Sequence, residues 1–136
     1  MLPLRYARLW RVLSAVLLLF VLAAALAPSW WFGTQDDALS WFPHADKWLH
    51  GLTFLALTVW FAGLAERRAW GRMAVALLLF GLLIEAAQLL TGYRVGDWID
   101  LAADALGILL GVAIAAAGLG GWGLRLEDWY SRRTAI

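Results

Sequence analysis

Four long apolar segments dominate this sequence, at residues 9–27, 48–64, 69–90 and 98–119. Each approaches the ~20 residues that a helix needs to cross a bilayer. The chain as a whole is 63% hydrophobic, whereas a soluble domain is about half apolar. The sequence therefore predicts an all-α fold, a transmembrane bundle of four helices that forms a single domain over residues 1–136.

The basic residues give this bundle a direction. Nine of the eleven fall on one side of the predicted spans: Arg5, Arg8, Arg11, Arg67, Arg68, Arg72, Arg125, Arg132 and Arg133. Lys47 and Arg94 fall on the other side. Because basic residues favour the cytoplasmic face, both termini are expected in the cytoplasm of a multi-pass inner-membrane protein. Residues 28–47 and 91–96 then face outward.

The first segment has an alternative interpretation as a signal peptide. The small residues of "AALA" before Pro28 offer a cleavage site, although a proline directly after that site disfavours cleavage. Removal of this segment would leave three spans with the same outer face.

Ionisable residues from three separate spans are predicted to lie at one depth in the outer leaflet. At ~1.5 Å per residue, His50, Glu85 and Asp104 lie roughly 6, 9 and 10 Å below the outer ends of their helices. A carboxylate at such a depth costs a few kcal/mol or more unless it is paired, protonated or bound to a metal. Glu85 and Asp104 lie inside apolar runs and cannot act as helix caps. A purely structural salt bridge is one interpretation of both, but such pairs often give no net stability, so a functional role is the stronger one.

Helical spacing turns these residues toward one another. On the fourth segment one face carries Asp97, Asp100, Asp104, Gly107, Gly111 and Ala115. On the third segment one face carries Gly81, Glu85, Gln88 and Gly92, and on the second Asp46, His50 and Thr53 share a face. Small residues let membrane helices pack closely. These faces are therefore expected to point into the bundle.

Several of these residues also have simple structural roles open to them. Asp46 fits an N-cap, and Asp97 with Asp100 has the spacing of a capping pair. Lys47 can extend to the membrane surface, and Arg94 can bind lipid head groups.

The charges of this cluster do not balance. Five carboxylates against Lys47 and Arg94 leave a net charge of −3 when His50 is neutral, which is too much to bury without compensation. Either some carboxyl groups hold protons or a cation binds. That cation is a metal ion, a proton or a positively charged group of a substrate.

Three stretches in order, "DKWLHGLTF" from Asp46, "EAAQ" from Glu85 and "RVGDWIDLAADALGILLG" from Arg94, resemble the VanZ-like family. Asp104 departs from the family pattern, which usually has Asn at that position. The resemblance implies a small multi-pass membrane protein of the cell envelope, in a family named for a protein linked to resistance to the lipid-tailed glycopeptide teicoplanin. It does not fix a reaction.

Together these observations give a candidate site. His50, Glu85 and Asp100 are the candidate catalytic residues, and the same three are the ligands if a divalent cation binds. The substrate-binding candidates are Asp46, Lys47, Gln88, Arg94, Asp97 and Asp104. Membrane lipids and a lipid-linked envelope precursor are the expected partners. The net charge of +1 gives no indication of nucleic-acid binding.

Four functions remain open from the sequence. The cluster suits an enzyme that acts on a lipid-linked or amphiphilic substrate, although no nucleophile motif accompanies it. It equally suits a module that binds such a compound without turnover. Ion- or proton-coupled transport and a structural role in a larger membrane complex are the alternatives.

Overall fold

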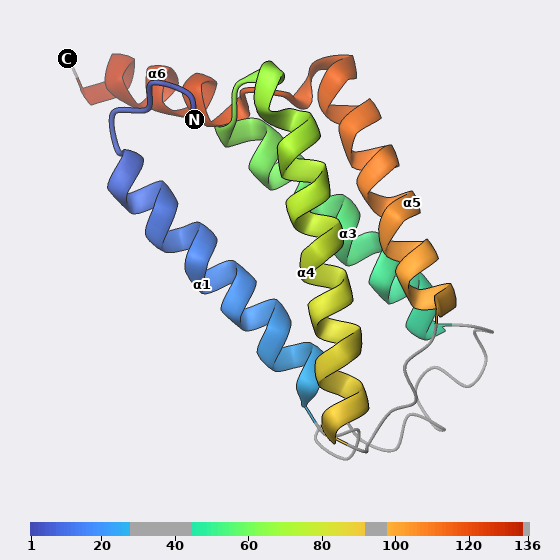
Figure 1. Ribbon diagram of the computed structural model, residues 1–136. Coiled ribbons are helices and arrows are strands. Elements are labelled where there is room, and N and C mark those ends of the chain that lie inside the picture. The colour runs from blue at the N-terminus through green and yellow to red at the C-terminus, as the bar shows by residue number, and fades with distance from the viewer. Residues whose placement is uncertain (28–44, 92–97, 135–136) are drawn as a thin grey trace.

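The computed structural model describes residues 1–27, 45–91 and 98–134, and within these ranges every regular element is helical (Figure 1). Four long helices form the bundle: α1 (Ala7–Leu26), α3 (Ala45–Leu64), α4 (Trp70–Thr91) and α5 (Trp98–Ile114). A 3-10 turn, η2 (Arg67–Ala69), joins α3 to α4. The predicted all-α fold is confirmed, with helix bounds within a few residues of the apolar segments.

Among the described residues, three stretches are long and apolar enough to cross a membrane: 7–26, 67–91 and 98–133. The helix α3 is not among these three stretches. Its first two turns carry Lys47 and His50. Many large apolar side chains on the bundle are exposed, including Leu19 and Phe20 on α1 and Leu109 on α5. Such a surface is abnormal for a soluble monomer and suits contact with lipid.

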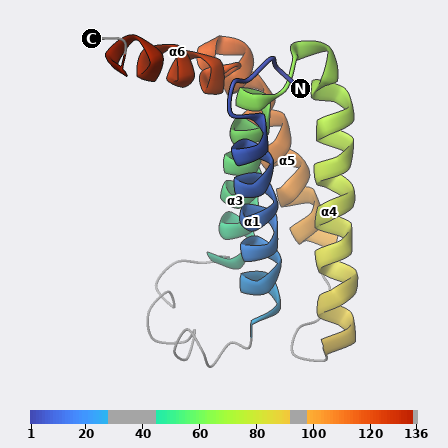
Figure 2. The same cartoon turned by 90° about the vertical axis from the view of Figure 1, so that its left-hand side faces the viewer.

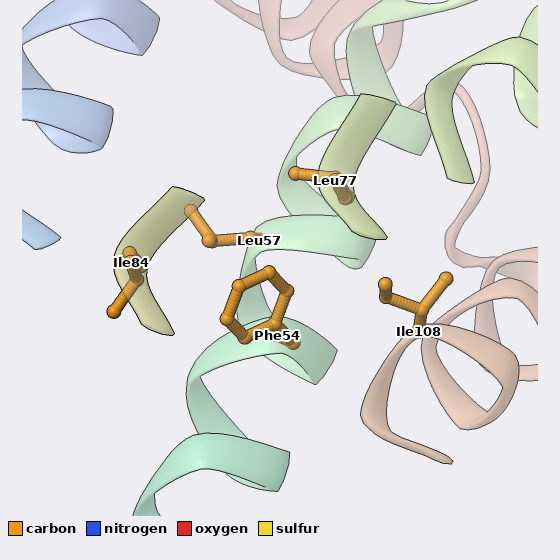
Figure 3. Packing of buried hydrophobic residues seen from close by; sticks show 5 residues of the cluster. All are labelled: Phe54, Leu57, Leu77, Ile84 and Ile108. Atoms are coloured by element: carbon orange, nitrogen blue, oxygen red, sulfur yellow. The ribbon is translucent and has the colours of Figure 1, made fainter. Parts of the chain in front are cut away.

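The centre of the bundle is an apolar cluster shared by α3, α4 and α5 (Figure 3). Its buried members are Phe54, Leu57, Leu77, Ile84 and Ile108. The inner face of α1 packs against this cluster through residues such as Leu18 and Leu22. α3 and α5 approach closely where Gly51 meets Gly107, because a Cβ at position 107 would overlap the carbonyl oxygen of Gly51.

The α-helix of the fourth apolar segment ends earlier than the sequence indicated. The expected helix 98–119 is α-helical only to Ile114, and η3 (Ala115–Leu119) is a π-turn that contains Gly118 at φ 144°. Glycine tolerates this conformation because it has no Cβ. Beyond it, α6 (Trp122–Thr134) lies across the end of the bundle rather than along it (Figures 1 and 2).

The N-terminus, the α3–α4 turn and α6 meet at one end of the bundle (Figure 2). The amide of Leu2 donates to the carbonyl of Leu64 at 3.0 Å, which ties the N-terminal segment to the end of α3. The nine basic residues that the sequence assigned to one side belong to the segments at this end. Lys47 lies at the opposite end, at the start of α3.

Candidate functional site

The first part of the site is a chain of polar contacts between α3 and α5. Nδ1 of His50 lies 3.0 Å from Oδ1 of Asp104, and Nζ of Lys47 donates to Oδ1 of Asp100 at 2.9 Å. Nε2 of His50 lies 3.9 Å from Oδ2 of Asp100, which is too long for a hydrogen bond. His50 is therefore held by one carboxylate, and its second nitrogen faces another.

Helical periodicity explains why these groups meet. Asp100 and Asp104 are one turn apart on α5, on the buried face that continues through Gly107 and Gly111. His50 lies one turn before Phe54 on the buried face of α3. The close approach of the two helices at Gly51 and Gly107 then brings the polar turns within hydrogen-bonding reach.

α4 supplies the third side of the site. Glu85 is buried on the predicted face of this helix, between Gly81 and Gln88. Ligand atoms of His50, Glu85 and Asp100 all lie within 4.8 Å of one another. Three helices thus place one nitrogen and two carboxylates around a common point. The shared depth was predicted for His50, Glu85 and Asp104, and a catalytic or metal-binding role for His50, Glu85 and Asp100 stays a prediction.

His50, Glu85 and Asp100 offer the nitrogen and oxygen ligand types that bind zinc at ~2.0–2.2 Å. Tetrahedral coordination at these bond lengths puts ligand atoms about 3.4 Å apart. The three side chains, whose ligand atoms lie within 4.8 Å of one another, would have to move closer together around an ion. The contact between His50 and Asp104 matches the carboxylate that commonly orients a metal-bound histidine.

The carboxylate of Asp104 has a described polar contact at only one of its two oxygens. It is fully buried, and its Oδ2 atom has no hydrogen-bond partner among the described residues. Gly81 provides the space for this atom, because a Cβ at position 81 would lie 2.6 Å from it. Such buried acceptors are rare in proteins and call for a specific explanation.

The described part of the site carries an excess of negative charge. Among the described residues, Glu85, Asp100 and Asp104 lie near one permanent cation, Lys47, and these four charges sum to −2 when His50 is neutral. In a membrane this excess is costly. A bound cation would offset it.

Gln88 lies on the predicted face of α4 but turns away from the cluster. Its Nε2 atom donates to the carbonyl oxygen of Ala25 at 3.0 Å. This oxygen is in the last turn of α1, where backbone carbonyls lack helical partners. The contact makes Gln88 a link between α1 and α4, and its role in binding a substrate stays a prediction.

Three predicted site residues fall outside the described structure. They are Arg94, Asp97 and the side chain of Asp46. Their roles as substrate-binding residues stay predictions. Lys47, which the sequence allowed to be a surface residue, instead contacts Asp100 inside the cluster.

A second polar centre, at the opposite end of the bundle, was not predicted. Glu127 on α6 is buried and accepts three hydrogen bonds, from the amides of Arg5 and Tyr6 and from the indole of Trp10, at 2.7, 3.0 and 2.8 Å. The available signal was the amphipathic stretch from Trp122 to Arg133, in which Gly123 and Glu127 are one turn apart on the same face.

Comparison with known proteins finds one family. The family model described as VanZ/LLP1 matches residues 3–119. The match includes the four long helices and the whole polar cluster, and it ends just before α6. No curated protein and no solved structure matches the chain.

Proposed function

The chain belongs to the VanZ/LLP1 family, and from this premise we propose that it is a four-span protein of the cell membrane whose outward-facing cluster binds the head group of an envelope amphiphile. The amphiphile is a lipid or a lipid-tailed compound such as a glycopeptide. The convergence of His50, Glu85 and Asp100 from three helices is the observation that carries this proposal.

The proposed topology rests on the separation of charge between the two ends of the bundle. Arginine-rich segments meet at the end that holds the N-terminus and α6, and this end is the cytoplasmic one under the positive-inside rule. Reporter fusions after Gly33 and Gly96 should read external, and a fusion after Arg68 should read cytoplasmic. The reverse pattern would place the cluster on the wrong face for an envelope ligand.

A divalent cation held by His50, Glu85 and Asp100 gives the cluster its affinity for a head group. The cation would compensate the net charge of −2, and a catalytic or binding metal site keeps a coordination position open for an outside ligand. A phosphate oxygen suits that position. Lys47, 2.9 Å from Asp100, would contribute a second positive charge beside it.

Binding is better supported than transport through the bundle. The side chains of Phe54, Leu57 and Ile84 belong to the apolar cluster at the centre of the bundle (Figure 3), and Phe54 is one helical turn beyond His50 on α3. An ion or proton path would need polar groups there. A structural role in a larger complex remains the alternative, and it predicts that neither metal nor lipid binds.

The test combines metal analysis with lipid binding. Purified protein should bind Zn²⁺ or Mn²⁺ at a stoichiometry near one, and His50→Ala and Glu85→Gln should each weaken this binding by at least about tenfold. In native mass spectrometry with added metal, the protein should retain phosphatidic acid in preference to diacylglycerol, and His50→Ala should remove that preference. Unchanged metal and lipid binding in both variants would refute the proposal.

A further inference from the structure

An apolar groove runs between α3 and α5 and opens beside the polar cluster. It encloses about 200 Å³. Its walls are formed by Trp48, Leu52 and Leu55 on α3 and by Ala103, Leu106 and Leu110 on α5. These residues recur every three or four positions, so each wall is a stripe along one face of its helix.

The glycine contact between the two helices explains the groove. Gly51 and Gly107 line it and bring the two backbones together. At the contact no side chain fills the space, and the leucines on either side form its walls. The buried face of α3, with His50 and Phe54, points to the other side. The groove therefore lies on the outer surface of the bundle, where a membrane protein meets lipid.

Lys47 is the charged residue among those that line the groove. Its Nζ atom contacts Asp100, and Asp100 belongs to the cluster with His50 and Glu85. The apolar groove and the polar site thus join at Lys47. A ligand bound across this junction has a hydrocarbon part along the leucines and an anionic part beside the lysine, where the cation proposed for the cluster offsets the charge of the carboxylates.

The size of the groove narrows the choice of ligand. Pockets that enclose drug-sized molecules measure ~300–1,000 Å³, so this groove suits a segment of one linear chain better than a ring system. The peptide core of a glycopeptide would not fit inside it.

We propose that the groove between α3 and α5 binds one hydrocarbon chain of a membrane lipid whose phosphate head group lies at Lys47 and the polar cluster. The proposal rests on the proposed function for the head group, and it adds the lipid class and the place of the tail. Binding is directional, with the head at the start of α3 and the chain running toward Leu110.

The groove can be filled without touching the polar site. Leu52→Trp and Leu106→Trp place a large ring in the groove. Leu49→Trp and Leu109→Trp are matched controls, because these leucines lie on the same helices and are similarly exposed, at 63% and 68% against 58% for both Leu52 and Leu106. The control positions do not line the groove.

The probe is phosphatidic acid with a photoreactive diazirine in one acyl chain, added to the protein in vesicles of phosphatidylcholine. Mass spectrometry of the parent protein should find crosslinks at the groove residues of α3 and α5. Leu52→Trp and Leu106→Trp should each reduce these crosslinks at least fivefold, whereas Leu49→Trp and Leu109→Trp should leave them unchanged.

The outcomes separate this proposal from the proposed function. If the groove variants crosslink and retain phosphatidic acid as the parent does, while His50→Ala does not, the groove proposal is wrong and the head-group site stands. If His50→Ala retains the preference for phosphatidic acid, the proposed function is wrong. Crosslinking spread evenly over the lipid-facing leucines, or a groove covered by a second copy of the chain, would also overturn the groove proposal.

Discussion

Glu127 and Asp104 are buried carboxylates at opposite ends of one bundle, and their surroundings differ. Glu127 accepts hydrogen bonds from Arg5, Tyr6 and Trp10. Asp104 contacts His50 through Oδ1, and its Oδ2 atom has no hydrogen-bond partner among the described residues. A carboxylate whose acceptors are filled by its own chain stabilises the fold, whereas one with spare capacity leaves room for a ligand or proton.

The environment of Glu127 supports a structural role in other ways. Trp10 and Trp122 pack edge to face at 5.4 Å between ring centroids, and the indole of Trp60 donates to Ser14 at 3.0 Å. This network fastens the start of α1 and α6 to α3. In the described part of the cluster around His50, by contrast, the acidic residues outnumber the permanent cations.

The largest effect on stability is expected from Glu127→Gln. A glutamine keeps one acceptor oxygen and presents an amide group to N–H donors, so charge-assisted hydrogen bonds are lost at a cost of about 3 kcal/mol. Thermal denaturation in detergent measures the loss, and hydrogen exchange should increase at residues 5–10. The exposed neighbour Asp128 gives the control, because Asp128→Asn should change stability by no more than about 0.5 kcal/mol. Equal effects would mean that Glu127 is not the anchor of α1.

A smaller loss of stability is expected from Asp100→Asn, because this substitution removes the carboxylate that pairs with Lys47. Breaking a fully buried pair costs ~3–5 kcal/mol. The Lys47 side chain is 20% exposed and can reach water, so we expect about 2 kcal/mol. A double-mutant cycle with Lys47→Gln checks this, because the second substitution should cost little once the first is present. Additive losses would show that the two side chains do not stabilise each other.

Lowering the pH should remove the contribution of Glu127 to the stability of the fold. Glu127 lies on α6, outside the four proposed spans. Burial raises the pKa of Glu127, but the N–H groups of Tyr6, Trp10 and Arg5 lower it by more, so the pKa lies below the ordinary value of 4.5. The unfolded chain then binds a proton more readily than the folded protein, and the stabilisation is fully present above pH 4.5. It is lost as the pH falls through the lower pKa of the folded state.

The measurement for this pH effect is the stability difference between the parent protein and Glu127→Gln at several pH values. The difference should be constant from pH 7 to about 5.5 and should shrink below 4.5. A difference that grows on acidification would mean that the pKa is raised rather than lowered.

The site around His50 could be predicted in part from the sequence, whereas the contacts of Glu127 at the other end of the bundle could not. Glu85 and Asp104 stand out because a carboxylate in an apolar span is costly, and helical spacing assigns each to a face that points into the bundle. Charged residues inside apolar segments can therefore be recognised in the sequence as candidate site residues. The shared depth of His50, Glu85 and Asp104 on inward faces was the basis for predicting that three helices meet there.

Contacts with backbone atoms left no such pattern. Glu127 binds two amides that are more than 120 residues away in the chain, and Gln88 binds the carbonyl of Ala25. Every residue has a backbone carbonyl and every residue except proline has a backbone N–H, so no sequence feature identifies the partner. The early end of α5 depended in the same way on one backbone conformation, at Gly118.

The smallest effect on stability is expected from Asp104→Asn, although this residue is the most buried of the cluster. Asparagine has nearly the volume of aspartate, and its oxygen can still accept a hydrogen bond from Nδ1 of His50. The substitution removes one negative charge from a site whose described residues carry a net charge of −2. We therefore expect stability within about 0.5 kcal/mol of the parent, or a small gain, because relief of charge offsets the new amide.

The same variant tests whether Asp104 orients His50 while Asp100 acts as a metal ligand. If Asp104 only orients His50, Asp104→Asn should lower metal affinity by about tenfold or less, which is the lower end of the effect of losing such a partner. Asp100→Asn removes a proposed ligand and should lower it further. Metal titrations of both variants in one detergent compare them directly. A greater loss of affinity or stability in Asp104→Asn would identify Asp104 as the ligand or proton carrier, and the role proposed for Asp100 would pass to it.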